Sequence, residues 1–183
     1  MLARISSLKL EQKFSTGLGG IGPNLDVLLW SNGTPFAIES KFTEPYTKSR
    51  LKTYLKPKYF HSGRRLWAEA TLPGCQAVAE MLRTGEHNFR VLDVAQLLKH
   101  MLALAHNFGS NWSLCCLWFE IEGAIAKQHR KDLTTFAAYT NNDAGKFFAL
   151  TYQELFTRLA SCADQDHAKY IAYLEGRYIR DQN

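Results

Sequence analysis

The sequence lacks the long apolar runs of a membrane protein and the glycine- and serine-rich tracts of an interdomain linker. Its longest apolar runs, such as residues 112–119, fall far short of the roughly 18 to 20 residues that span a bilayer. Residues 1–14 also lack the apolar core of a signal peptide. With 183 residues, 46% of them hydrophobic, the chain is expected to form one globular domain over residues 1–183, to lie in the cytoplasm and to have no membrane contact.

Paired metal-binding cysteines and histidines are absent as well. The four cysteines form no CxxC pair, and none of the six histidines has an HxxxH partner that could complete a zinc set. Cys115 and Cys116 are adjacent in an apolar stretch that reads as a strand, so their side chains should point to opposite faces. We therefore expect reduced, mostly buried thiols and no zinc site.

A nucleotide cofactor is not expected either. Residues 17–22 match the spacing GxGxxG, but a dinucleotide-binding loop must follow a strand and open a helix. Here the segment follows a predicted helix and leads through Pro23 into a predicted strand, and the sequence contains no GKS or GKT. We expect a flexible loop beside the functional site.

Positive charge is concentrated in one part of the chain. The net charge is +5, and residues 41–65 carry eight lysines and arginines against the single acid Glu44, so the remainder is close to neutral. Aromatic residues alternate with these cations, which is the mixture that contacts phosphates and stacks on bases. The alternative is a solvated basic loop. The predicted nucleic-acid-binding residues are Lys48, Arg50, Lys52, Lys56, Lys58, Tyr59, Arg64, Arg65 and Lys99.

Hydrophobic spacing and capping signals predict an alternation of helices and strands. Residues 4–14 contain good helix formers and predict a first helix, whereas residues 43–64 predict a long loop with short elements. The other helices are expected at 65–83 with an interruption at 72–74, from Asp93 to about 106, at 124–139, after the capping box 151–154, and at 164–179, with strands at 112–122 and 146–150.

The firmest prediction is a β-hairpin over residues 25–42. Two runs rich in apolar, β-branched and aromatic residues flank Asn32-Gly33, a pair that tolerates the positive φ angles of a two-residue turn. Such a turn pairs Ser31 with Thr34, and the same register places Asp26 opposite Glu39. Lys41 follows Glu39 by two residues and should therefore share its face of the hairpin.

Two carboxylates facing each other across a β-ladder repel, so this pair requires a partner unless both are ordinary solvated surface groups. Apolar residues surround them on both faces of the hairpin, which argues against the solvated alternative. A divalent cation would remove the repulsion. Hard oxygen ligands favour Mg²⁺, with Mn²⁺ as a substitute, and nearby cysteine or histidine ligands for zinc are not evident.

The pattern of Asp26 followed by Glu39-Ser40-Lys41 resembles the PD-(D/E)XK phosphodiesterases, in which an acid on one strand precedes (D/E)-x-K on the next. Residues 10–14, 23–26, 38–44 and 95–100 look like a bacterial group of restriction endonucleases within that superfamily. Pro23 stands three residues before the acid rather than next to it, and the C-terminal half matches no motif.

The resemblance implies roles for particular residues. Asp26 and Glu39 would bind Mg²⁺ with the Ser40 carbonyl, and Lys41 would position or deprotonate the attacking water. Either one or two metal ions could act. Glu11 resembles the auxiliary acid of many relatives, although a solvated helix glutamate is the alternative.

Residues 96–100 of the following predicted helix could support the same site. Gln96 could assist it directly or could only cap the helix that Asp93 opens. Lys99 and His100 are expected to be phosphate contacts or surface groups rather than catalysts.

Together these patterns predict an α/β restriction-endonuclease-like domain, with a mixed sheet of four to five strands and helices on both faces. The predicted function is Mg²⁺-dependent hydrolysis of DNA, and cutting of both strands would favour a homodimer. Two alternatives stay open: a non-catalytic nucleic-acid-binding or assembly module of the same fold, and a nuclease for RNA or for particular nucleic-acid structures.

Overall fold

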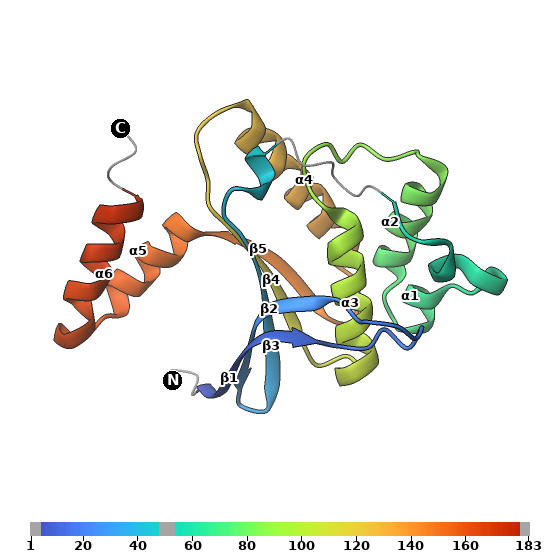
Figure 1. Cartoon of the computed structure of the whole chain (residues 1–183), viewed down its shortest axis with the longest axis horizontal. Coiled ribbons are helices and arrows are strands. Elements are labelled where there is room, and N and C mark those ends of the chain that lie inside the picture. The colour runs from blue at the N-terminus through green and yellow to red at the C-terminus, as the bar shows by residue number, and fades with distance from the viewer. Residues whose placement is uncertain (1–4, 48–53, 180–183) are drawn as a thin grey trace.

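The computed structural model describes residues 5–47 and 54–179 of the chain. Within them, five strands form one mixed sheet in the order β1-β2-β3-β4-β5 (Figure 1). The first three strands are antiparallel neighbours, whereas β3, β4 and β5 run parallel. The strands are β1 Ile5–Lys13, β2 Asn24–Ser31, β3 Thr34–Lys41, β4 Ser113–Trp118 and β5 Lys146–Thr151. The predicted α/β fold with a mixed sheet is confirmed.

The hairpin has the predicted register. Val27 pairs with Ile38 and Ser31 pairs with Thr34. Asn32 and Gly33 connect the strands with φ angles of 50° and 79°, the positive values that a type I′ turn requires. The turn therefore sets which side chains of β2 and β3 share a face.

The predicted first helix is wrong, because Ile5–Lys13 forms the edge strand β1. Leu8 pairs with Leu29 and Leu10 with Val27 on β2. The residues of this segment are good helix formers, but pairing with the neighbouring strand outweighs such a weak local preference. Leu8 and Leu10, two residues apart, follow the period of a strand, and each is 59% exposed.

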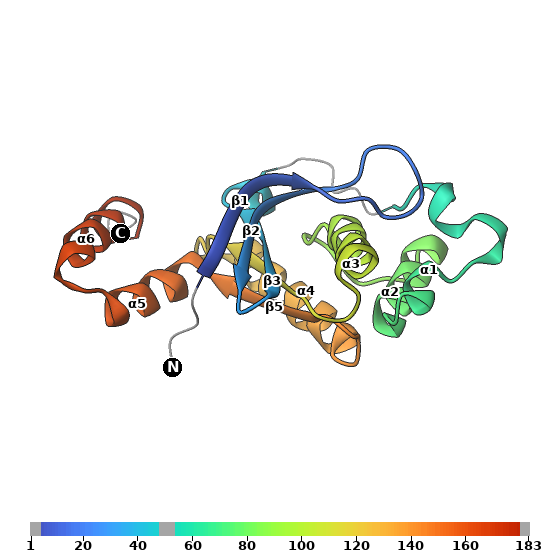
Figure 2. The same ribbon diagram turned by 90° about the horizontal axis from the view of Figure 1, so that it is seen from below.

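Four helices cover one side of the sheet, and α5 and α6 lie on its other side (Figure 2). The first four are α1 Leu66–Glu69, α2 Pro73–Thr84, α3 Val94–Phe108 and α4 Ala124–Thr140. Alternate strand residues such as Leu28, Ala37 and Leu114 join these helices in the main core. Asp93 accepts a hydrogen bond from the Gln96 backbone N–H and begins α3 as predicted.

The C-terminal helices are α5 Tyr152–Cys162 and α6 Gln165–Tyr178, and they extend from the end of β5 away from α1–α3 (Figure 1). The predicted capping box is present, because Thr151 and Glu154 each accept a hydrogen bond from the other's backbone N–H. The long segment after β3 contains only the short helices η1 Glu44–Tyr46 and η2 Pro57–Gly63 among its described residues, as expected. None of the described helices is long and apolar enough to cross a membrane.

Candidate active site

Three acidic residues stand on neighbouring strands at the end of the sheet away from the hairpin turn. The β1–β2 register pairs Leu10 with Val27 and Gln12 with Leu25, so Glu11 stands opposite Asp26. Continuing the β2–β3 register one step past the Val27–Ile38 pair brings Asp26 opposite Glu39. The alignment that the hairpin predicted is therefore present, and β1 adds a third acid to it.

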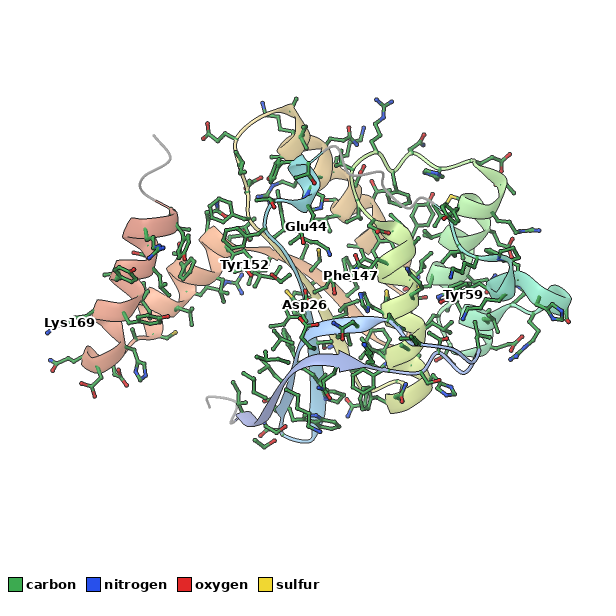
Figure 3. All side chains as sticks on the ribbon, in the orientation of Figure 1. Asp26, Glu44, Tyr59, Phe147, Tyr152 and Lys169 are labelled. Atoms are coloured by element: carbon green, nitrogen blue, oxygen red, sulfur yellow. The ribbon has the colours of Figure 1, made fainter. Side chains whose placement is uncertain are left out.

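Asp26 does not point straight at Glu39. Its Oδ2 accepts a hydrogen bond of 2.7 Å from the backbone N–H of Ser40, so the carboxylate reaches across to β3. Burial raises the pKa of Asp26, the Ser40 N–H opposes that rise, and the charges of Glu39 and Glu11 add to it. Asp26 lies near the centre of the molecule (Figure 3).

Glu39 is the most deeply placed of the three acids, with 1% exposure. Its Oε1 lies 2.7 Å from Lys41 Nζ and accepts a hydrogen bond of 2.6 Å from Gln96 Nε2. Its Oε2 lies 3.0 Å from His100 Nε2, but the ring N–H is not aligned with it, so Oε2 is a buried oxygen without a hydrogen-bond partner. The two oxygens thus have different surroundings.

The charges of this group depend on one another. Burial alone would raise the pKa of Glu39, but the contacts with His100 and Lys41 outweigh it and hold the pKa below its ordinary value. Burial likewise opposes the charge of Lys41, and the attraction of Glu39 outweighs it, so the pKa of Lys41 is raised. In this arrangement Glu39 is an anion and Lys41 an ammonium group.

The carboxylate oxygens are of the type that a hard divalent cation takes, but each acid contacts a different protein group in this structure. Among the residues that the structure describes, no three acidic, histidine or cysteine side chains are arranged to hold a metal ion by themselves. Glu11 accepts from the Asn24 amide, Asp26 from Ser40, and Glu39 from Lys41 and Gln96. The uncommitted Oε2 of Glu39 nevertheless provides a buried oxygen ligand of the kind that Mg²⁺ prefers.

Glu11 lies near Asp26 as a residue of strand β1, whereas the sequence predicted it on a first helix. Its backbone φ is 52°. A positive φ at a non-glycine residue is uncommon, and in a strand it accompanies a local irregularity that re-aims the side chain. Its role as an auxiliary acid stays a prediction.

His100 is the residue that sequence reasoning misplaced. It was expected at the surface or on a phosphate, yet it is 1% exposed and faces Glu39. Gln96 and His100 are four residues apart on α3 and so share one helix face. That spacing was available in the sequence, and Gln96 contacts Glu39 as well as belonging to the first turn of α3.

A cavity of about 200 Å³ borders this group on the side of the helices. Lys41 and Gln96 line it together with Glu44 of η1 and His129 of α4. Burial lowers the pKa of His129 to about 4. Lys41 is thus reachable from a space large enough for several water molecules.

Part of the predicted basic surface forms a second cavity, of about 260 Å³, between η2 and the glycine-rich loop. Lys56, Lys58 and Lys99 line it, and Lys58 Nζ donates a hydrogen bond to the Gly19 carbonyl. Tyr59 also lines this cavity, but its ring is 5% exposed and stacks on Trp67, so it supports the wall instead of offering an open stacking face.

The other predicted nucleic-acid contacts do not join this cavity. Arg64 forms an ion pair with Glu69, and the backbone N–H of Arg65 also donates to Glu69. Both arginines are exposed at the far end of η2. Lys48, Arg50 and Lys52 lie outside the described residues.

The glycine-rich loop connects two antiparallel strands, β1 and β2. The expectation that a helix precedes it was wrong, but the loop opens no helix, so the strand–loop–helix order of a dinucleotide site is not formed here. At Gly22 a Cβ would lie 1.8 Å from the Phe14 carbonyl oxygen, so a side chain does not fit there. The loop closes tightly just before Asp26.

Comparison with curated proteins finds no match, and comparison with solved structures finds none either. The model of one protein family matches residues 4–179, which is nearly the whole chain. That family is described as "Restriction Endonuclease associating with ARP". The chain therefore belongs to this restriction-endonuclease family, and its membership indicates a nuclease or defence-type role with DNA as the substrate.

Proposed function

We propose that the chain is a Mg²⁺-dependent endonuclease of the PD-(D/E)XK type that hydrolyses DNA phosphodiester bonds. The observation that carries this proposal is the Glu39 carboxylate, buried to 1% exposure, paired with Lys41 and one step across the sheet from Asp26. Removing a charged carboxylate from water is unfavourable unless it is paired or binds a metal. Glu39 Oε2 is a buried oxygen without a hydrogen-bond partner, as expected of a metal ligand before the ion binds.

Asp26 and Glu39 would hold the ion, with the Ser40 carbonyl as the third protein ligand that the superfamily resemblance implies. A bound Mg²⁺ or Mn²⁺ supplies charge stabilisation at the phosphate and lowers the pKa of its water. Lys41 keeps its proton in the present arrangement, because the pKa of Lys41 is raised by Glu39. Its Nζ is therefore suited to orient water or phosphate as a donor, and acting as a base would require it to leave Glu39.

Lys56, Lys58 and Lys99 would hold the DNA backbone beside this centre. The glycine-rich loop connects the two places, since it forms one wall of the lysine-lined cavity and leads directly into β2 and Asp26. Phosphate contacts of this kind fix the position of a duplex and carry no sequence information. They support DNA as the substrate without defining a recognition sequence.

The decisive experiment incubates the full chain with supercoiled and linear DNA, with Mg²⁺, with Mn²⁺ and with EDTA. We expect cleavage with either ion, none with EDTA, and loss of cleavage in Asp26→Asn and Lys41→Met. Glu80→Gln is the matched control, because Glu80 is a paired acid that contacts Arg83 on α2, outside the strands that carry this centre. Cleavage that persists in both site variants would refute the proposed active site.

A non-catalytic binding module of the same fold is the second candidate. It would bind DNA and show no divalent-ion binding that depends on Asp26, so titration of Mn²⁺ into the wild type and Asp26→Ala separates the two candidates. Substituting RNA or branched DNA for duplex DNA in the same assay tests the nuclease alternative. Sedimentation with and without DNA tests the proposed homodimer.

A further inference from the structure

His100 is a buried histidine whose ring nitrogens both lack an aligned hydrogen-bond partner. It is 1% exposed and belongs to the middle of α3. Buried polar groups in folded proteins are almost always hydrogen-bonded, so each exception requires an explanation. The short distance of 3.0 Å from His100 Nε2 to Glu39 Oε2 provides one, because these are two unsatisfied atoms facing each other.

The two oxygens of Glu39 are not equivalent in this arrangement. Oε1 accepts from Lys41 and from Gln96, and two donors occupy the acceptor positions of a carboxylate oxygen. Oε2 contacts only the His100 ring among the described residues. Oε2 is therefore the oxygen that remains available to a metal ion, and His100 is the group that contacts it.

Gln96 and His100 approach Glu39 from consecutive turns of one helix. Gln96 Nε2 contacts one carboxylate oxygen and His100 Nε2 the other. The Gln96 hydrogen bond at one oxygen and the His100 ring 3.0 Å from the other limit rotation of the carboxylate about its last torsion, so its direction is largely set before the ion arrives. Groups that orient a metal ligand in this way commonly control metal affinity without touching the ion.

We propose that His100 is a positioning residue that fixes the Glu39 carboxylate and presents Oε2 to the divalent ion. This inference rests on the proposed metal-dependent function and goes beyond it by naming the ligand atom and the residue that orients it. The ordinary alternative is a histidine that only fills the core. Met101, the next residue of α3, provides the comparison, since it is equally buried but its sulfur contacts Cys75 of α2.

The test measures Mn²⁺ binding to the full chain by calorimetry in the absence of DNA. Replacing a residue that orients a metal ligand typically weakens metal binding by about 10- to 100-fold, and we expect this loss for His100→Leu. His100→Gln retains an N–H donor and should recover most of the affinity. Met101→Ala removes an equally buried side chain of α3, whose sulfur contacts Cys75 of α2 and not the carboxylates, and should leave Mn²⁺ affinity within about 2-fold, whatever it does to stability.

A second readout separates positioning from folding. The Mn²⁺ concentration that gives half-maximal cleavage should rise in His100→Leu by the same factor as the dissociation constant, while kcat at saturating Mn²⁺ stays close to the wild-type value. A histidine that only filled the core would lower the unfolding midpoint and leave both metal values unchanged. That result would overturn the inference.

Two further outcomes keep the proposals separable. If His100→Leu does not fold, His100→Met and His100→Gln are compared instead, and equal Mn²⁺ affinities in these two variants would refute the role of the N–H donor. Mn²⁺ binding that requires Glu39 and His100 in a protein that cuts no DNA would support this inference and reject the proposed function. If the wild type cuts DNA but replacing His100 does not change Mn²⁺ affinity, the proposed function is supported and this inference is rejected.

Discussion

Among the described residues, buried carboxylates occur in two regions, and they have different hydrogen-bond partners. On α4, Asp132 is 2% exposed, and its Oδ2 accepts hydrogen bonds from the backbone N–H groups of Arg90, Val91 and Leu92, at 2.8, 2.8 and 3.2 Å, while its Oδ1 accepts from the Gln128 side chain. After α4, Asp143 accepts from Gly74 and Cys75 at the start of α2. Both acids connect loops and helix ends to the core.

At the sheet end, Glu39 is buried just as deeply but its partners are side chains, namely Lys41, Gln96 and His100. One of its oxygens has no aligned donor. Asp26 and Glu11 add like charge nearby. Backbone donors are fixed by the fold, whereas lysine and glutamine side chains can rotate away, which the proposed metal ion would require of the partners of Glu39.

This difference suggests how an acid that only stabilises the fold can be told from one that is a candidate metal ligand. Burial alone does not distinguish Asp132 from Glu39, and neither does charge. What distinguishes them is that backbone N–H groups fix one oxygen of Asp132 and a side chain fills the other, whereas Glu39 has only side-chain partners and one oxygen without a hydrogen bond.

The largest effect is expected at Glu39. Glu39→Gln retains the shape of the side chain and removes the charge that would hold the metal, so cleavage should fall by about 1,000-fold, comparable with removing a central group that stabilises the transition state. Plasmid nicking under single-turnover conditions measures the decrease. Asp132→Asn, the matched change in the other region, should cut at the wild-type rate once folded. Equal decreases in the two variants would remove the distinction between the regions.

For the free energy of unfolding, we expect the larger effect at Asp132 and the smaller one at Glu39. Asp132→Ala leaves three backbone N–H groups without an acceptor, and at about 1 to 3 kcal/mol for each unsatisfied buried group we expect a decrease of about 4 kcal/mol in the free energy of unfolding. Urea unfolding measures it. Glu39→Gln should lower stability far less, because it also relieves the burial of a charge. A decrease well below 4 kcal/mol in Asp132→Ala would mean that water replaces the carboxylate as the acceptor of the three N–H groups.

Much of this arrangement could be predicted from sequence, and the physical reasons differ between elements. Asn32-Gly33 specified the register of β2 and β3, because few residue pairs accept two positive φ angles. Asp93 and Thr151 marked the starts of α3 and α5 through local capping. Local chemistry determines these features, so they are visible in a single sequence.

The failures all involve contacts between distant segments. Ile5–Lys13 looked helical because its residues form helices well, and only pairing with β2 makes it a strand. His100 looked like a surface group because its spacing from Gln96 indicates only a shared helix face and not that Glu39, 61 positions earlier, lies opposite it. Asp132 gave no signal, since its partners are backbone N–H groups of a loop some 40 residues away.

The buried His129 on α4 provides a further test, through the pH dependence of stability. Burial lowers the pKa of His129 to about 4, whereas an unfolded histidine has a pKa near 6.5. Below pH 6.5 the unfolded chain therefore binds a proton that the folded chain refuses, so stability falls as the pH drops from about 6.5 to about 4 and is unaffected outside that window.

At 1.36 kcal/mol for each pKa unit, this decrease is about 3 kcal/mol. His129→Leu removes it, so the difference in unfolding free energy between the wild type and His129→Leu should shift by that amount in favour of the variant across the window. Other titrating groups are common to both proteins and cancel in the difference. A difference that does not vary with pH would show that His129 is protonated or solvated in the folded chain.

The smallest effect is expected on the lysine-lined cavity, where Lys56 and Lys58 are exposed to solvent. Replacing Lys56 and Lys58 by glutamine should weaken DNA binding by about 10-fold at low salt and reduce the slope of log affinity against log salt by about 1 for each phosphate that the protein no longer neutralises. Stability should not change, because both side chains are exposed. Fluorescence anisotropy with a labelled duplex at several salt concentrations measures both quantities.

Lys169→Gln is the matched control for this last prediction. Lys169 is an exposed lysine of α6, on the far side of the sheet from the lysine-lined cavity (Figure 3). A general attraction between a basic protein and DNA would lower the salt slope for any lysine removed, whereas a defined groove lowers it only for Lys56 and Lys58. Equal slopes for the two sets of variants would mean that the DNA is held elsewhere, and the carboxylate region would then need another route to its substrate.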